Sequence, residues 1–247
     1  MQFLEHYKTV RRAEHWGSTD PAYYRDLPLV AADDSHAEIW RVRAATFRML
    51  LRALGHSRRV LDLGAGNGWL ANRLVQAGHS VAALDMSDDI FDGLGAAKHY
   101  ATGFGLYQAM FDALPFADSQ FDVLVFNASL HYSTNLSWTL GASLRVLAAD
   151  GTLVVMDSPM YRKPASGQAM LAEKARQFEE RYGSTAPDNQ IGFLTFYDFE
   201  SLAREFSIRW RWTEPFVDLR WAARQGRARW LGQREPARFG LMIGTRK

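Results

Sequence analysis

Three glycines at alternate positions follow a short aliphatic run in Val60-Leu-Asp-Leu-Gly-Ala-Gly-Asn-Gly-Trp-Leu70. Because glycine lacks a Cβ atom, Gly64, Gly66 and Gly68 permit a sharp turn and let a ligand approach the backbone. Turns of this kind bind nucleotide-type cofactors. Dinucleotide-binding turns, however, prefer Gly-x-Gly-x-x-Gly, and the bulky Trp69 stands where that third glycine belongs. The spacing therefore disfavours nicotinamide and flavin dinucleotides.

Three aspartates stand beside this turn or where later strands are expected to end. Asp85 follows the second strand, where a carboxylate accepts hydrogen bonds from ribose hydroxyls. Asp112 follows the third strand and suits an adenine amino group, while Asp62 suits a methionine ammonium group. Any one of these aspartates alone is compatible with a solvated loop or a cap. Together with the glycines, they predict a site for S-adenosylmethionine, whose product is S-adenosylhomocysteine.

Short aliphatic runs alternate with helical patterns from residue 59 to residue 159, which is typical of βαβ units and a parallel sheet. The expected strands are 60–63, 80–84, 106–111, 121–127 and 152–157. The expected helices are 69–77, 88–100 with Ser87 as its N-cap, and 136–148. Ligands of such sheets bind at the carboxyl ends of the strands, so the glycines and aspartates are expected to meet there.

The flanking segments carry further elements. Residues 37–54 have the apolar periodicity of a helix that packs on the sheet, and the aromatic-rich lead before them is expected to lie over the site without a helical pattern of its own. Residues 165–182 favour a helix, and Thr195 opens a capping box for another. Residues 208–212 alternate as in a strand, with an antiparallel partner near the end of the chain.

Several landmarks between residues 60 and 157 occur in a recognisable order. They are Asp62-Leu-Gly-Ala-Gly-Asn-Gly68, Asp85, Asp112-Ala-Leu-Pro-Phe116, Phe121-Asp122, the strand end from Asn127 to Tyr132, and Gly151-Thr-Leu-Val-Val155. In this order they resemble the class I S-adenosylmethionine-dependent methyltransferases, in particular the broad group that includes the ubiquinone and menaquinone biosynthesis methyltransferases. The resemblance is specific for the cofactor and says little about the substrate.

This resemblance implies an α/β fold of the Rossmann-like class, with a mostly parallel seven-stranded sheet, helices on both faces and an antiparallel carboxyl-terminal strand. It implies one domain over 1–247, made of a lid and substrate region (1–58), a cofactor-binding core (59–160) and substrate-side helices with the last two strands (161–247). The implied cofactor-binding residues are Asp62, Gly64, Ala65, Gly66, Gly68, Asp85, Met86, Asp112, Ala113 and Asn127.

Methyl transfer from a sulfonium is an in-line displacement, so the protein mainly supplies alignment and exclusion of water. A hydroxyl or acidic carbon acceptor would still need a base. His131 is the first candidate because it follows the fourth strand, with Tyr132 as a weaker companion; the alternative is that His131 caps the following helix or fixes a loop. The seven histidines form no His-x-x-x-His pair, so no metal site is predicted.

Aromatic residues of the lead could wall an apolar acceptor pocket, although core packing explains each of them as well. The candidates for substrate contact are Tyr24, His36 and Trp40. Asp157 at the end of the fifth strand is a fourth candidate, and capping of the turn before Pro159 is its alternative role.

Composition limits the remaining possibilities. The 247 residues contain no cysteine, which excludes disulfides and thiolate sites. No apolar run reaches the length of a membrane span, and the amino terminus lacks a signal peptide, so a cytoplasmic protein is expected. Residues 61–157 carry ten aspartates and three basic residues, whereas residues 200–247 carry eleven basic and five acidic residues. The basic segment could meet an anion, or it reflects a general preference for arginine.

Four functions remain open from the sequence. The leading one is methylation of a small molecule at oxygen, nitrogen or carbon, by a monomer or homodimer. RNA methylation through the arginine-rich segment is an alternative, which the absence of a recognisable RNA-binding module disfavours. A non-catalytic S-adenosylmethionine-binding protein and a nicotinamide-dependent oxidoreductase are the other two.

Overall fold

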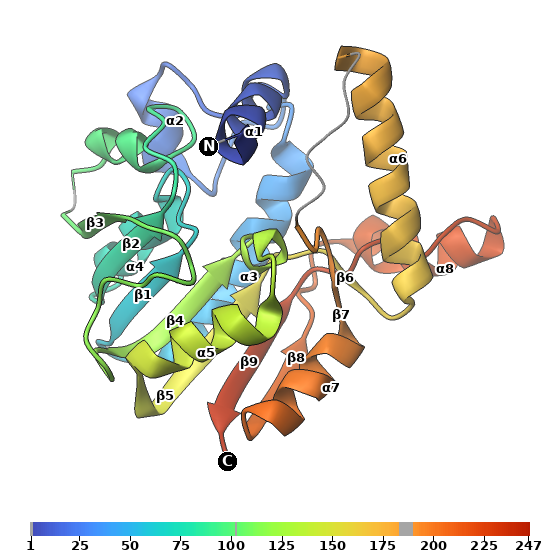
Figure 1. The fold of residues 1–247 in the computed structure, drawn as a ribbon. Coiled ribbons are helices and arrows are strands. Elements are labelled where there is room, and N and C mark those ends of the chain that lie inside the picture. The colour runs from blue at the N-terminus through green and yellow to red at the C-terminus, as the bar shows by residue number, and fades with distance from the viewer. Residues whose placement is uncertain (1, 102, 183–189) are drawn as a thin grey trace.

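The computed structural model describes residues 2–101, 103–182 and 190–247, and its centre is a seven-stranded sheet in the order β3-β2-β1-β4-β5-β9-β8 (Figure 1). The strands are β1 (Arg59–Leu63), β2 (Ser80–Asp85), β3 (Gly105–Gln108), β4 (Phe121–Asn127), β5 (Leu147–Met156), β8 (Ile208–Thr213) and β9 (Leu241–Arg246). Strand β9 runs antiparallel to both of its neighbours, and the pairs among β1 to β5 are parallel. The predicted fold class is therefore confirmed.

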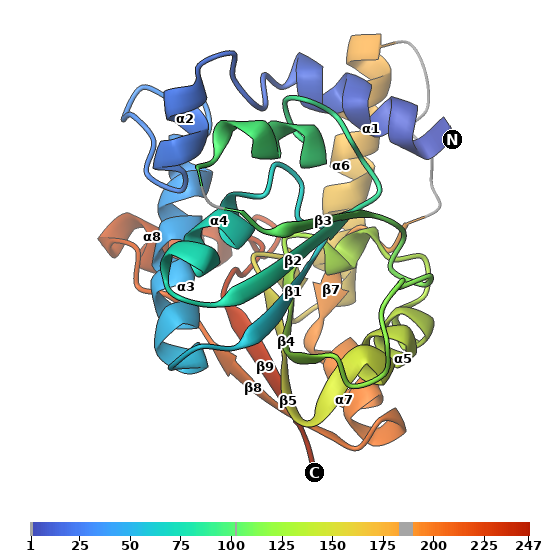
Figure 2. The same ribbon diagram turned by 90° about the vertical axis from the view of Figure 1, so that its left-hand side faces the viewer.

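Helices cover both faces of this sheet (Figure 2). Val60, Val125 and Val154 point to one face and pack with α3 (Ala37–Leu54) and α4 (Trp69–Gln76). Their sequence neighbours point to the opposite face and pack with α5 (Leu136–Val146) and α7 (Phe196–Glu205). The central strands are apolar throughout because both of their faces are buried.

The strand order reverses direction at β1, since β2 and β3 lie on one side of it and β4 and β5 on the other. A sheet of this kind has its ligand crevice at the carboxyl ends of the strands, beside the reversal. Helices α1 (Gln2–Ala13) and α2 (Pro21–Asp26) lie over this edge (Figure 1). The lead therefore lies where a lid was expected, but the expectation that it lacks helices is wrong.

The predicted helix over residues 88–100 is also wrong, because only a short 3-10 helix, η1 (Leu94–His99), forms there. The Asp89 carboxylate accepts hydrogen bonds from the backbone amides of Phe91 (2.8 Å) and Asp92 (3.1 Å), and the Ser87 hydroxyl accepts one from Asp89 N (3.3 Å). Such side-chain bonds to nearby amides compete with helical hydrogen bonding. Ser87 thus caps a turn instead of a helix.

Strand β3 is shorter than predicted, since it ends at Gln108 instead of residue 111. It is an edge strand with exposed side chains, and the chain leaves it for a loop that continues to Gln120. Asp112 consequently lies in that loop and not directly at a strand end. In the opposite direction, β5 begins at Leu147, five residues before the predicted start, because Leu147 pairs with Phe121 across an irregularity in the register.

The remaining elements complete the fold. Helix α6 (Pro164–Tyr182) agrees with its prediction, and the capping box between Thr195 and Asp198 opens α7 as expected. The other elements are η2 (Leu130–Tyr132), β6 (Met160–Tyr161), β7 (Leu194–Thr195) and α8 (Leu219–Trp230), for which no prediction was made. In the described part of the chain, no helix combines the length and apolarity that crossing a membrane requires.

Candidate functional site

The glycine turn joins β1 to α4, and its three glycines have φ angles of 74°, 54° and 77°. Residues other than glycine rarely adopt such φ angles. A Cβ on Gly64 would lie 2.4 Å from the Cβ of Ser129, whereas a Cβ on Gly66 would meet nothing closer than the Asp92 carbonyl oxygen at 3.8 Å. Gly64 is therefore required by packing within the protein. Gly66 leaves the open side of the turn for a ligand.

Asp85 ends β2 and is bonded to the glycine turn. One carboxylate oxygen accepts a hydrogen bond from the Gly66 amide and the other accepts one from the Ser87 amide, both at 2.8 Å. Burial raises the pKa of Asp85 to about 6, and these amide bonds oppose the shift. The carboxylate thus lies at the edge where the second strand and the glycine turn meet.

Asp62 lies in β1 and is fully buried. Neither of its carboxyl oxygens has a hydrogen-bond partner among the described residues. Burial raises its pKa to about 8, and the nearby charge of Asp85 raises it further. A buried carboxylate without a partner is costly, so this position favours a bound cation.

Asn127 ends β4 and supplies a second unpaired polar group at the same edge. Its side chain is buried, and its amide oxygen has no partner among the described residues. The chain then turns through Ala128 at φ 53°, and the Ser129 hydroxyl donates a hydrogen bond to the Leu63 carbonyl. Ser129 thereby ties the ends of β4 and β1 together against Gly64.

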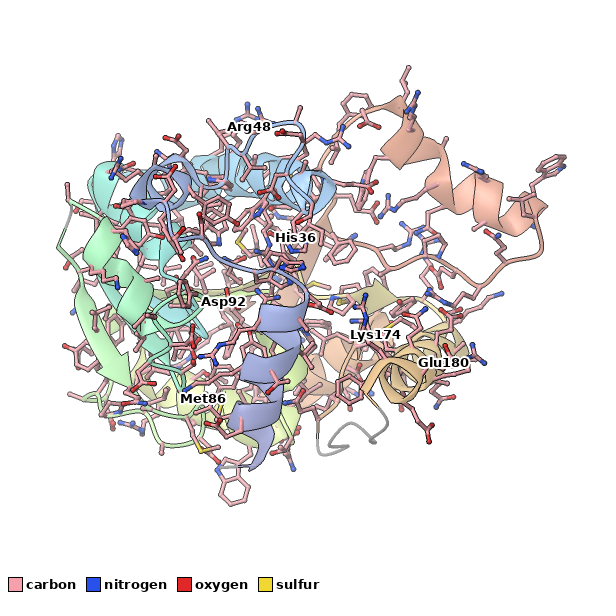
Figure 3. All side chains as sticks on the ribbon, turned by 90° about the horizontal axis from the view of Figure 1, so that it is seen from above. His36, Arg48, Met86, Asp92, Lys174 and Glu180 are labelled. Carbon is pink, nitrogen blue, oxygen red and sulfur yellow. The ribbon has the colours of Figure 1, made fainter. Side chains whose placement is uncertain are left out.

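The other cofactor candidates lie on two loops. Met86 directly follows β2 (labelled in Figure 3), and its carbonyl accepts a hydrogen bond from the Gln108 side chain at 3.1 Å. Ala65 is buried in the turn, and its amide donates to the Leu84 carbonyl at 3.0 Å. Asp112 and Ala113 are exposed, and Asp112 makes no hydrogen bond or ion pair within the described chain. All the cofactor candidates except Asp112 and Ala113 therefore lie at the carboxyl ends of β1, β2 and β4 or in the turns that directly follow these strands.

His131 lies in η2, directly after β4. Its Nδ1 is 3.3 Å from the Ser158 hydroxyl oxygen. Burial lowers the pKa of His131 to about 3, and the positive charges of Lys174 and Arg43 lower it further. The ring is therefore neutral at physiological pH. A general base works best with a pKa near the working pH, so this environment makes His131 a weak base.

Tyr132 lies under α1. Its ring meets the Tyr7 ring edge-on at 5.7 Å between centroids and lies 4.2 Å from that of His131. Burial raises the pKa of the Tyr132 phenol, which remains protonated at physiological pH. Tyr7 therefore connects the lead to the strand end that carries both catalytic candidates.

Basic residues of α1 hold this helix on the loop that follows Asp85. Arg11 pairs with Asp92, Arg12 with Asp89 at 2.9 Å, and Lys8 with Asp88 at 3.5 Å; we call these six residues the clasp. A small hollow, partly open to solvent and lined by Tyr7, Trp16 and Phe91, lies between α1 and the loop. Seen from above the edge, α1 crosses the site with Asp92 beside it (Figure 3).

The four substrate candidates have different surroundings. The buried Tyr24 hydroxyl donates to Phe91 O or Ser18 O at 2.9 Å, and the His36 ring stacks on Trp16 at 3.8 Å. Trp40 is buried between Trp16 and Trp69, with its indole N–H lacking a partner among the described residues. These three side chains join the lead to α3 and to the loop after β2.

Asp157 follows β5 at φ 53° and is buried. One carboxylate oxygen accepts a hydrogen bond from the Thr46 hydroxyl at 2.8 Å, and the other has no partner among the described residues. Burial raises the pKa of Asp157 to about 6, while the positive charge of Arg43 opposes the shift. Asp157 thus connects the end of β5 with α3.

Sequence reasoning missed Arg43, although the sequence contains a signal for it. Trp40, Phe47, Leu50 and Leu54 form the apolar stripe of α3, and Arg43 stands on the same stripe. A cation at a core-facing position requires an explanation. Ser158 and Lys174 were also missed, and their positions in the sequence give no comparable signal.

Comparison with known proteins gives a consistent result for this edge of the sheet. Residues 61–155 match the family model described as "Methyltransferase domain". The malonyl-[acyl-carrier protein] O-methyltransferase of Pseudescherichia vulneris is 31% identical over 60% of this chain and 58% of that protein. A ubiquinone/menaquinone biosynthesis C-methyltransferase of Pseudomonas putida is 26% identical over 68% of this chain and 74% of that protein. The resemblance to class I methyltransferases and this biosynthetic group is thus confirmed.

Other relatives and solved structures extend this likeness. The arsenite methyltransferase of Aquipseudomonas alcaligenes is 32% identical over 59% of this chain and 42% of that protein. The chain spans about half the length of the first curated relatives that it matches. The YcgJ protein of Bacillus subtilis has a TM-score of 0.61 at 14% identity, covering 82% of this chain and 98% of that one. The 1,6-didemethyltoxoflavin-N1-methyltransferase of Burkholderia thailandensis, solved with 1,6-didemethyltoxoflavin and S-adenosylhomocysteine, has a TM-score of 0.53 at 16% identity, covering 99% of this chain and 90% of that one. These solved structures support the fold alone.

Proposed function

We propose that this chain is an S-adenosylmethionine-dependent methyltransferase that acts on a small-molecule acceptor. One observation carries the proposal: the methyltransferase match over residues 61–155 contains a buried carboxyl, Asp62, which has no hydrogen-bond partner among the described residues and stands directly before the glycine turn. An unpaired buried acid is costly in the free protein and is stabilised by a cationic ligand group. S-adenosylmethionine carries such a group, its methionine ammonium.

The residues at the edge fit the other parts of this cofactor. The Asp85 carboxylate accepts hydrogen bonds from ribose hydroxyls in this proposal, and the open side of Gly66 receives the ligand backbone. The Asn127 amide oxygen, which has no partner among the described residues, would accept a hydrogen bond from the methionine moiety. Gly64, Ala65, Gly68 and Met86 shape the turn, and Asp112 with Ala113 would reach the adenine from their loop. When bound, the cofactor supplies an electrophilic methyl group.

The protein contributes alignment and exclusion of water. Tyr7 and the clasp hold α1 over the carboxyl edge, so residues 1–58 act as the lid and substrate region of a single domain over 1–247. Residues 59–160 form the cofactor-binding core in this assignment, and residues 161–247 complete the acceptor side. His131 contacts the acceptor as a neutral ring, and Tyr132 does so as a protonated phenol, together with Asp157, Tyr24, His36 and Trp40.

The relatives support an acceptor other than nucleic acid, since their names specify malonyl-[acyl-carrier protein], arsenite and ubiquinone/menaquinone biosynthesis. RNA methylation through the arginine-rich carboxyl segment and cofactor binding without catalysis are the alternatives. We assign the protein to the cytoplasm as a monomer or homodimer without nucleic acid.

Calorimetric titration of the purified chain with S-adenosylmethionine and with NAD tests the cofactor. Binding of S-adenosylmethionine alone is the expected result, and binding of NAD alone overturns the proposal. Mass spectrometry of copurifying ligands then supplies candidate acceptors. Acceptor-dependent formation of S-adenosylhomocysteine distinguishes an enzyme from a binding protein, and steeply salt-dependent RNA binding with RNA methylation would favour the RNA alternative.

A further inference from the structure

Helix α8 packs on residues 236–239 with one of its faces. The Arg224 guanidinium donates a hydrogen bond to a carbonyl of that segment at 3.0 Å, and the Gln225 side chain donates another at 2.9 Å. The Trp221 ring packs against the same segment, and the Arg224 guanidinium lies over this ring at 3.6 Å. Ala228, on the same face, is buried. These side chains fix the orientation of the helix on the protein.

The opposite face of α8 is apolar and exposed. Leu219, Ala223, Gly226 and Trp230 follow one another at intervals of four, three and four residues, so they form one stripe along the helix. The Leu219 and Trp230 side chains are 78% and 85% exposed, and Phe216 just before the helix is 71% exposed. A helix on the surface of a soluble protein normally presents polar residues to water. Large apolar side chains grouped on an exposed face are typical of an interaction surface.

Arginines border this stripe on both sides. By helical position, Arg220 and Arg227 lie on one side of it and Arg229 on the other. All three are exposed, and none forms a hydrogen bond or an ion pair with a side chain that the structure describes. Asp218, the only acid of the helix and its cap, accepts a hydrogen bond from a backbone amide and pairs with Arg41 at 3.3 Å. The exposed face therefore combines an apolar centre with cationic borders.

A flat anionic surface fits this arrangement. A helix in the interface of a bilayer places leucine and tryptophan at the boundary of the acyl chains, while arginines on its borders reach the lipid phosphates. Both cationic borders then meet the same surface at once. Figure 1 shows α8 at the periphery of the molecule, beyond the β8 end of the sheet, where such a surface can approach it. A second copy of α8 would instead bring like charges together.

The helix also lies beside the carboxyl edge of the sheet. Arg238, in the segment that carries α8, pairs through its backbone with Met160, four residues after the end of β5. Arg41, the partner of Asp218, belongs to the first half of α3, ahead of the Thr46 hydroxyl that bonds to Asp157. A surface bound by α8 would thus lie near the end of the sheet that carries the proposed site.

We propose that α8 binds the surface of an anionic phospholipid bilayer through this face. Leu219 and Trp230 enter the interface, and the three bordering arginines contact lipid phosphates, which a guanidinium can bind with two parallel hydrogen bonds. Because the helix is short and much of the attraction is electrostatic, the binding is reversible and weakens with added salt. This inference goes beyond the proposed methyltransferase function and does not depend on it.

The test is co-sedimentation of the purified full chain with vesicles of phosphatidylcholine alone or of phosphatidylcholine and phosphatidylglycerol in equal amounts. One variant removes the apolar anchor, Trp230→Ser, and another removes the charges, Arg220→Gln/Arg227→Gln/Arg229→Gln. The matched controls change an exposed tryptophan of α5 and three exposed arginines in and after α3 (Arg48 is labelled in Figure 3). They are Trp138→Ser and Arg48→Gln/Arg52→Gln/Arg58→Gln.

We expect binding to the anionic vesicles and little binding to phosphatidylcholine alone. Trp230→Ser should weaken the partition coefficient by about 5- to 30-fold, and the triple α8 variant by about a hundredfold at low salt. Both controls should bind as the unaltered protein does. The Tm should stay the same in every variant, because each altered side chain is exposed.

Failure of the unaltered protein to bind the anionic vesicles, equal binding to both kinds of vesicle, or equal losses in the controls and the α8 variants would each overturn the proposal. Sedimentation velocity supplies a further test. A dimer that Trp230→Ser dissociates, without vesicle binding, would show that a second copy covers this face and would overturn it too. Since no step uses S-adenosylmethionine, the result is separate from that for the proposed function.

Discussion

The cofactor side and the acceptor side of the carboxyl edge are built in different ways. The cofactor side is formed mainly by one strand-turn-helix unit and the next strand, with Asp62, the glycines and Asp85 close together in the sequence. The proposed acceptor side takes Tyr7 from α1, Arg43 from α3, His131 from η2 and Asp157 from the turn after β5. Local spacing can therefore predict the first side, while long-range packing has to assemble the second.

The two sides also differ in charge. Asp62 is buried and Asp85 is half-buried, and both have raised pKa values beside the position proposed for a cationic ligand. Arg43 and Lys174 place positive charge on the other side. Methyl transfer brings a cationic donor to a nucleophile, so this separation of charge orients both substrates. Substitutions on the cofactor side should therefore change the affinity for the methyl donor and leave the affinity for the acceptor unchanged.

The largest expected effect is that of Gly64→Ala. The new Cβ would occupy a left-handed backbone conformation and lie 2.4 Å from the Ser129 Cβ. Strain and overpacking together should lower the free energy of unfolding by about 2 to 5 kcal/mol. Urea denaturation measures the change. Gly55→Ala is the matched control, because Gly55 also has a positive φ but no atom within 4 Å of its Cβ position, so an equal loss in both variants would contradict the packing argument.

The next largest effect is that of Asp85→Ala on donor binding. Loss of the charge-assisted ribose bonds, worth about 1.5 to 3 kcal/mol, should weaken S-adenosylmethionine binding by about ten- to a hundredfold. Calorimetry measures the dissociation constant. Asp118→Ala is the control, since Asp118 is an exposed partner of Arg145 away from the edge. An unchanged dissociation constant in Asp85→Ala refutes the ribose assignment.

The pH dependence of donor binding should identify Asp62. Its pKa of about 8 in the free protein lies above its unfolded value, so Asp62 destabilises the free fold increasingly as pH rises from about 4 to 8. A bound ammonium favours the ionised carboxyl and lowers that pKa. Binding should therefore release a proton below pH 8 and tighten by up to about tenfold per pH unit between pH 6 and 8.

Calorimetry in two buffers with different ionisation enthalpies measures this proton release. Asp62→Asn should bind the donor more weakly and lose most of the proton release between pH 7 and 8. Asp85, with a pKa of about 6, should still contribute to the proton release at lower pH in this variant. Identical proton release at pH 7.5 in the variant and the unaltered protein would show that Asp62 is not the titrating group.

The smallest expected effect concerns the clasp. Exposed ion pairs contribute about 0.2 to 1 kcal/mol each, so the double variant Lys8→Gln/Arg12→Gln should speed S-adenosylmethionine dissociation by about two- to fivefold. Stopped-flow displacement measures the rate, and added salt should reproduce the effect in the unaltered protein. Arg52→Gln, an exposed residue of α3, is the control. If neither added salt nor the double variant changes the dissociation rate, α1 does not act as the lid.

Much of the fold followed from patterns of residues. The helix over Ala37–Leu54 and the strand over Phe121–Asn127 agree with their predicted bounds, because each has an unbroken period and clear ends. The predicted helix over residues 88–100 failed because Asp89 and Ser87 bond to nearby amides, which periodicity alone does not reveal. Helix α1 was missed because the partners that hold it, Asp89 and Asp92, lie about 80 residues further along the chain.

The sequence by itself determined the sheet, the glycine turn and the acidic positions beside it, because these depend on spacing along one short segment. Only the tertiary structure decided that Asp62 lacks a hydrogen-bond partner among the described residues, that His131 is a weak base and that Arg43 packs against Trp16 and Trp40. Each of these properties depends on burial and on charges brought from distant elements. A pKa or a ring contact of a guanidinium is a property of the packed surroundings, which no local pattern specifies.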